Sequence, residues 1–292
     1  MKWTVLSDNR SNDNRLSTEH GLSVLLETTN EREQCDARIN IAERGGVRRS
    51  QTERHRILLD TGASDVFIRN AKLLGVDLSS VDYVFISHGH SDHAGGLRYF
   101  LEQNRLAKVI VSPAVINKKF YSKRGNLHSI TTVWPENIKD RLITIDKSCK
   151  ISDDLYVIAH FPQIYPMPKG NKHLFVEDIN GDCKPDNFQH ELGLYTDGFL
   201  FTGCAHNGLE NILAACPYSV RSVVGGFHLL DGQEPEEEQL ILAERLKDHY
   251  STTQFYTSHC TGDNVFEVMK GVMGEQLQSF RCGTIGYFPV DN

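Results

Sequence analysis

Residues 87–93 carry the side chains with the clearest potential for chemistry in this chain. They read Ser-His-Gly-His-Ser-Asp-His, so three imidazoles and one carboxylate lie within six residues, in the pattern H-x-H-x-D-H. Zinc and similar divalent ions prefer such ligands. A histidine pair in a loop is usually only solvated, but four potential ligands directly after an apolar run over 81–86 favour a metal-binding turn. We therefore expect a strand that ends in this turn and a helix that begins just beyond it.

The elements that position this turn follow a pattern that recurs along the chain. A strand-like apolar run, then ligand-type polar residues, then a helical pattern occur at 86–93, 201–206, 224–228 and 256–260. This alternation is typical of an α/β protein, and such folds place ligands in the loops at the carboxyl ends of strands. Strands are expected over 22–27, 56–62, 81–86, 108–111, 220–225, 254–257 and 284–288, a hairpin over 192–203, and helices over 97–104, 211–215, 235–247 and 264–270. We expect several of the loops to converge on one site.

Length and composition favour one domain over residues 1–292, with an ordinary apolar fraction of 39%. The net charge of −7 implies no general attraction to nucleic acid or to anionic membranes. The seven cysteines are scattered, which favours reduced thiols in a cytoplasmic protein over a disulfide framework. The N-terminus lacks the apolar core of a signal peptide, and no stretch has the length that crosses a bilayer. A homo-oligomer is compatible with these features.

Two segments and one carboxylate bear on how a site would be built. Residues 30–55 are rich in Arg, Glu, Asn and Gln and are expected to form an exposed excursion. Residues 114–190 are expected to be irregular and to wall a pocket, because their prolines over 161–168 exclude a regular helix. Asp60 ends an apolar run, where a carboxylate needs a partner. We expect it to hold a metal-bound histidine in place, with a turn or helix cap as the alternative.

The order of these motifs resembles the metallo-β-lactamase superfamily. The resemblance rests on His-Gly-His-Ser-Asp-His-Ala-Gly-Gly at 88–96, Leu-Asp-Thr-Gly at 59–62 and Leu-Phe-Thr-Gly-Cys at 200–204. It implies a four-layer αββα sandwich with two metal ions at one edge, between the sheets. Further motifs are similar to the subgroup named for dihydropterin-ribofuranosylaminobenzene phosphate synthase, and they lie at 20–23, 188–191, 203–208, 225–229 and 258–262.

The resemblance also implies ligands for two ions. Those of the first ion are His88, His90 and His190. Those of the second ion are Asp92, His93 and His259.

Cys204 is a departure from the family, because most of its hydrolases have a bridging aspartate at this place. A thiolate favours zinc over harder ions, with iron or manganese as alternatives. We expect Cys204 to be a ligand; the alternatives are a small buried residue beneath the site, or His206 as the ligand in its place.

His206 and His228 lie in motif loops but exceed the usual ligand count. Either could bind a phosphate or carboxylate of the substrate, act as a proton donor, or simply pack. Glu191 is expected to orient an imidazole or to cap a strand.

The expected function is a metal-dependent hydrolase. A zinc-activated hydroxide, oriented by Asp92, would attack an ester, lactone, thioester or phosphoester of a small, anionic molecule. One alternative is a transferase of the subgroup's named type, which releases pyrophosphate. Another is a di-iron redox protein or a non-catalytic metal-binding protein.

Overall fold

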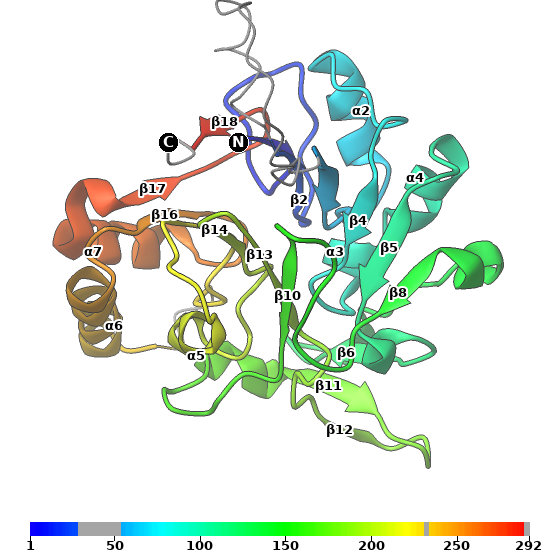
Figure 1. Cartoon of the computed structure of the whole chain (residues 1–292). Coiled ribbons are helices and arrows are strands. Elements are labelled where there is room, and N and C mark those ends of the chain that lie inside the picture. The colour runs from blue at the N-terminus through cyan, green and yellow to red at the C-terminus, as the bar shows by residue number, and fades with distance from the viewer. Residues whose placement is uncertain (29–53, 231–233, 289–292) are drawn as a thin grey trace, which may run out of the picture.

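The computed structural model describes residues 1–28, 54–230 and 234–288, so the excursion predicted at 30–55 lies almost wholly outside the described residues. Two seven-stranded sheets face each other, and helices cover the outer face of each (Figure 1). This is the expected four-layer αββα sandwich. Its three apolar clusters lie between the sheets and beneath each helical layer.

The first sheet has the strand order β18-β1-β2-β3-β4-β5-β8. Strands β3, β4, β5 and β8 are parallel to one another, and the others pair antiparallel. Its strands are β1 (Lys2–Ser7), β2 (Ser23–Glu27), β3 (Arg56–Leu59), β4 (Tyr83–Phe85), β5 (Lys108–Val111), β8 (Leu142–Thr144) and β18 (Ile285–Tyr287).

The second sheet has the order β17-β16-β15-β14-β13-β10-β9, with β14 to β17 parallel. Strands β13 and β14 form the predicted hairpin, whose turn residues Asp197 and Gly198 both have positive φ. Its strands are β9 (Cys149–Lys150), β10 (Tyr156–Ala159), β13 (Leu192–Thr196), β14 (Phe199–Phe201), β15 (Ser222–Val224), β16 (Gln254–Thr257) and β17 (Leu277–Ser279).

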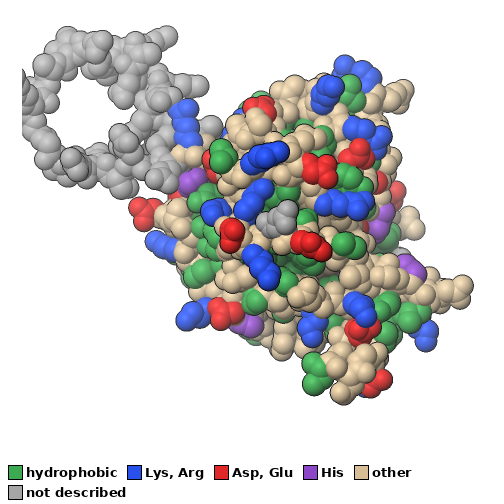
Figure 2. Space-filling model, turned by 90° about the vertical axis from the view of Figure 1, so that its right-hand side faces the viewer, with side chains coloured by type: hydrophobic (Ala, Val, Ile, Leu, Met, Phe, Trp, Pro, Cys, Tyr) green, Lys and Arg blue, Asp and Glu red, His purple; other side chains and the backbone are tan. Residues whose placement is uncertain are grey.

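Alternation along the strands builds the layers, because successive side chains point to opposite faces of a sheet. In the first sheet, Val24 and Leu26 enter the central core, whereas Leu25 packs under the helices. In the second sheet, Phe201 enters the central core and Leu200 faces the other way. Charged side chains of both signs are interspersed over the face shown in Figure 2.

The helices divide between the two outer layers. Residues of α2 and α4 pack on the first sheet, and residues of α5, α6 and α7 pack on the second. The α-helices are α2 (Val66–Leu73), α3 (Ser91–Ala94), α4 (Leu97–Gln103), α5 (Leu209–Ala215), α6 (Glu236–His249) and α7 (Asp263–Met273). Short 3-10 helices are η1 (Pro113–Val115), η2 (Glu136–Arg141), η3 (Lys169–His173) and η4 (Gly274–Gln276). Within the described ranges, none of the helices is both long and apolar enough to span a bilayer.

The segment 114–190 is more regular than its sequence suggests. It contains all four strands of a third sheet, in the order β12-β11-β6-β7, seen at the bottom of Figure 1. The strands are β6 (Phe120–Ser122), β7 (His128–Ser129), β11 (Leu174–Glu177) and β12 (Cys183–Pro185). The hairpins are short and pair with strands more than 45 residues away, so no local pattern predicts the sheet.

Candidate metal centre

Sharp turns at the carboxyl ends of strands bring the candidate residues together. Asp60, Ala205, His228 and His259 follow β3, β14, β15 and β16, and their φ angles are 56°, 56°, 50° and 52°. Non-glycine residues rarely adopt this left-handed conformation, and it clusters at functional sites. The turn after β14 also needs Gly203, whose φ is 60° and at which a Cβ atom would collide with the Ser87 side chain. The predicted convergence of strand-end loops is present.

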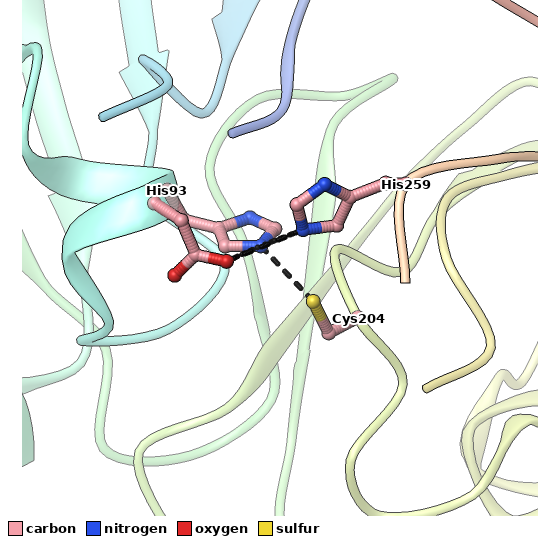
Figure 3. Close-up of side chains that lie close together, drawn as sticks. His93, Cys204 and His259 are labelled. Atoms are coloured by element: carbon pink, nitrogen blue, oxygen red, sulfur yellow. Dashed lines mark hydrogen bonds and ion pairs between the residues drawn. The ribbon is translucent and has the colours of Figure 1, made fainter. Parts of the chain in front are cut away.

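One group combines Asp92, His93, Cys204 and His259, which lie in loops of both sheets. Figure 3 labels His93, Cys204 and His259 of this group. Nε2 of His93 lies 3.0 Å from Sγ of Cys204 and 3.1 Å from Nε2 of His259. Oδ2 of Asp92 lies 3.3 Å from Nε2 of His259 and 3.6 Å from Nε2 of His93. Ligand atoms around a tetrahedral zinc lie roughly 3.3–3.7 Å apart, as follows from zinc–ligand bonds of ~2.0–2.3 Å. The four side chains are therefore spaced like a ligand set.

A second group beside the first combines His88, His90 and His206, all buried. Nε2 of His88 lies 3.3 Å from Nε2 of His206. A third combination joins Cys204 and His206 to His228, so both of the residues left open as alternatives, Cys204 and His206, face the centre.

Asp60 determines which nitrogen of two histidines faces the centre. Its Oδ1 accepts the backbone N–H of Ser87, and its Oδ2 accepts the Ser87 hydroxyl, each at 2.7 Å. Oδ2 also accepts a hydrogen bond from Nδ1 of His93 at 2.6 Å. Because the Ser87 hydroxyl donates to Asp60, it accepts from Nδ1 of His88 at 2.9 Å. Both rings then carry their proton on Nδ1 and direct a lone pair on Nε2 into the centre.

Two asparagines fix the opposing histidines in the same way. Asn9 donates to the carbonyl oxygen of His259 and accepts from its Nδ1, at 3.0 and 3.1 Å. Asn171 does the same for His206, at 2.8 and 3.0 Å. When these rings are neutral they face one another with Nε2 lone pairs, an arrangement that repels unless a cation or a proton lies between them. This donor set of imidazoles, one thiol and one carboxylate fits a divalent ion of the zinc type.

The charges around the centre agree with this fit. Burial and the neighbouring His93 and His90 lower the pKa of His88 well below its usual value, so its ring is neutral, as a ligand must be. Burial lowers the pKa of His259, but the hydrogen bond to Asp92 and nearby negative charges outweigh it and raise that pKa to about 9. Burial, together with Cys260, raises the pKa of the Cys204 thiol well above its usual value. A bound cation would displace these protons.

Two predicted residues, His190 and Glu191, make contacts that the sequence did not specify. His190 belongs to a separate group with His90 and Asp186, whereas His206 is grouped with His88 and His90. Glu191 accepts hydrogen bonds from the backbone N–H groups of His206 and Asn207, at 2.7 and 2.8 Å. It therefore holds the loop that carries His206 and does not orient an imidazole through its side chain.

Several contacting residues were not singled out from the sequence. Asp8 accepts the backbone N–H of His259 at 3.1 Å, and the ring of His20 stacks on that of His259 with centroids 4.9 Å apart. Nε2 of His20 lies 3.4 Å from Oδ2 of Asp92. His20 begins a motif noted in the sequence, which could have identified it. Asp8 and the two asparagines carry no such signal, because their contacts span long separations in the chain.

The centre opens into a cavity of about 360 Å³. Asp92, Cys204, His206 and His228 form its floor, and residues of the third sheet and its hairpins form a wall. This volume is in the range of small-molecule sites. The wall residues include Ser122, Arg124, His128, Ile130 and Leu174.

Comparison with known proteins agrees with the fold and the motifs. A model of the metallo-beta-lactamase superfamily matches residues 47–126. An uncharacterized protein of Methanocaldococcus jannaschii is 26% identical over 293 residues, covering 97% of both proteins. The 7,8-dihydropterin-6-methyl-4-(beta-D-ribofuranosyl)-aminobenzene-5'-phosphate synthase of the same organism is 23% identical, covering 97% of this chain and 95% of the synthase. The crystal structure of Tm1679, described as a metal-dependent hydrolase of the beta-lactamase superfamily, matches with a TM-score of 0.75 and 26% identity over 99% of each chain.

The sandwich fold and these matches make the chain similar to the metallo-β-lactamase superfamily. It is also similar over nearly its whole length to the two proteins of M. jannaschii. The superfamily consists mostly of metal-dependent hydrolases, and the His and Asp groups of this chain could hold a metal ion.

Proposed function

We propose that this protein is a zinc-dependent hydrolase that cleaves an ester, lactone, thioester or phosphoester of a small anionic molecule. The observation that carries the proposal is the pair of adjacent ligand groups, with inward lone pairs, on the floor of a cavity. His88, His90 and His206 would hold one ion, and Asp92, His93, Cys204 and His259 the other. Bound zinc would supply a nucleophilic water at neutral pH and polarise the bond to be cleaved.

The chain's own residues supply orientation. The Asp92 side chain is 20% exposed and lines the cavity, so its carboxylate can accept a hydrogen bond from the attacking water and aim it at the substrate. Asp60, Asn9 and Asn171 keep the ligand rings in fixed tautomers and so preorganise the site. Glu191 keeps the loop of His206 in place.

The cavity wall supports a small substrate with a negative charge. Arg124 lies on this wall and donates from Nη2 to Nε2 of His228 at 3.3 Å. An arginine there attracts carboxylate or phosphate groups, which it can bind in a bidentate manner. Ile130 and Leu174 on the same wall give an apolar surface for the rest of the molecule.

The test combines metal analysis with substrate screening. We expect the purified native protein to contain zinc and to hydrolyse a member of a panel of phosphodiesters, lactones and thioesters. His90→Ala should lose bound metal and all hydrolysis, whereas His249→Ala, at the exposed end of α6, should match the native protein. An unchanged metal content in His90→Ala would refute the assignment.

A transferase is the second candidate, and the similarity to the M. jannaschii synthase over 97% of the chain favours it. In this case an amine or carbon nucleophile would displace a diphosphate from a pterin. Release of pyrophosphate that requires both co-substrates would support the transferase. Hydrolysis of a substrate without a second organic substrate would support the hydrolase.

A further inference from the structure

Asp186 is a buried carboxylate between two histidines and has no part in the function proposed above. It follows β12, and its side chain is 1% exposed. Oδ1 accepts the backbone N–H of Phe188 at 2.8 Å. Oδ2 lies 3.0 Å from Nε2 of His190 and 3.6 Å from Nε2 of His90. Each of the two rings thus directs its Nε2 towards Oδ2 of Asp186.

The tautomer of His190 follows from its other nitrogen. The backbone N–H of Gly89 donates to Nδ1 of His190 at 3.2 Å. Because a backbone amide can only donate, Nδ1 carries the lone pair and the neutral ring carries its proton on Nε2. That proton is donated to Asp186. Both nitrogens of His190 are therefore used within the protein, and neither offers a lone pair to a metal ion.

The tautomer of His90 follows from the same carboxylate. Nε2 of His90 is buried and has no hydrogen-bond partner among the described residues. A lone pair there would face the carboxylate oxygen and be repelled, whereas an N–H is attracted. With the proton on Nε2, His90 has its lone pair on Nδ1.

We propose that Asp186 is a positioning residue that fixes His90 with Nδ1 as its metal-binding atom, and that His190 anchors Asp186 and does not bind the metal. The inference rests on the proposed function for the presence of an ion next to His90. Asp186 would thus fix the tautomer of His90, as Asp60 fixes the tautomers of His88 and His93. It also accounts for the grouping of His206, and not His190, with His88.

The first test measures ring protonation by ¹⁵N NMR in the zinc-loaded native protein and in the metal-free protein. We expect His90 and His190 to be protonated on Nε2 in both forms, and zinc to change the Nδ1 signal of His90 but not the signals of His190. A proton on Nδ1 of His90, or a zinc-bound signal from His190, would overturn the proposal. Because no variant is needed, a folding defect cannot obscure the result.

The second test compares variants by zinc stoichiometry and by chelator competition. His190→Gln should keep the native number of ions, because the glutamine amide can still donate to Asp186. Asp186→Asn should weaken zinc binding by about 10–100-fold, as expected when a partner of a metal-binding histidine is removed. His88→Ala should lose an ion, and a loss of the same size in His190→Gln would overturn the proposal.

These tests separate the inference from the proposed function, because they count ions and protons and not turnover. Correct tautomers and zinc binding without any hydrolysis would refute the hydrolase and leave the role of Asp186 in place. Hydrolysis together with zinc bound to His190 would support the hydrolase and refute the role of Asp186.

Discussion

Replacing Asp60 by asparagine is the sharpest test of how this centre is built. Asn fits the left-handed backbone at this position, where φ is 56°, and keeps the shape of the side chain. The carboxylate now accepts three hydrogen bonds, two from Ser87 and one from Nδ1 of His93. An amide has one oxygen and one NH₂ group, so a donor must face a donor in either orientation.

The magnitude follows from the two orientations of the amide. With the oxygen towards His93, the NH₂ group faces the backbone N–H of Ser87, and a buried unpaired donor costs about 1–3 kcal/mol. With the NH₂ group towards His93, the ring must move its proton to Nε2, and the lone pair for zinc is lost. Removing such a partner weakens metal binding by about 10–100-fold, or ~1.4–2.7 kcal/mol. The two costs are comparable, so both stability and affinity should fall.

The assay is chelator competition for zinc together with thermal unfolding of the metal-free protein. We expect Asp60→Asn to lower the zinc affinity by about 10–100-fold. It should also lower the Tm of the metal-free protein by several degrees, at roughly 2–4 °C per kcal/mol for a chain of this size. The control is Asp65→Asn, whose side chain is 48% exposed and should change neither value. Native zinc affinity in Asp60→Asn would show that the carboxylate does not set the tautomers.

Three further outcomes are expected. Cys204→Ser should reduce bound zinc in elemental analysis far more than Cys260→Ser, because the Cys204 thiol lies 3.0 Å from Nε2 of His93; equal losses would count against Cys204 as a ligand. Gly203→Ala should lower the free energy of unfolding by on the order of 2–4 kcal/mol in urea, since its φ is 60° and its Cβ would meet Ser87; an unchanged midpoint would contradict this. Removal of metal by a chelator should lower the Tm and added zinc should restore it, because an ion that binds only the folded chain stabilises it; a Tm insensitive to both would argue against a bound ion.

The fold was predictable where its causes are local. The apolar run before residues 87–93 gave strand β4, and Asp197 with Gly198 gave the hairpin of β13 and β14. Strand β1 was missed because its stability comes from pairing with β2 and with β18, which lies at the other end of the chain. Helix α2 was not predicted either, because no side-chain cap marks its first turn.

The candidate site divides in the same way. The positions of His88, His90, Asp92 and His93 follow from one motif, and their roles as ligands remain predictions. The contact between Asn9 and His259 joins residues 250 positions apart, which no local pattern reveals. The sequence alone also could not choose between His190 and His206 as a ligand of the first ion. Only the structure shows that Gly89 and Asp186 contact the two ring nitrogens of His190.

The meeting of His93 and His259 has a mechanical consequence. These residues stand 166 positions apart and belong to loops of opposite sheets, yet their Nε2 atoms are separated by 3.1 Å. An ion bound by both histidines would link the two halves of the sandwich and close a very long loop of chain without a covalent bond. With the ion bound, the loops of the two sheets would then stay together at this edge while substrate binds. Without the ion, the two sheets would separate more readily there.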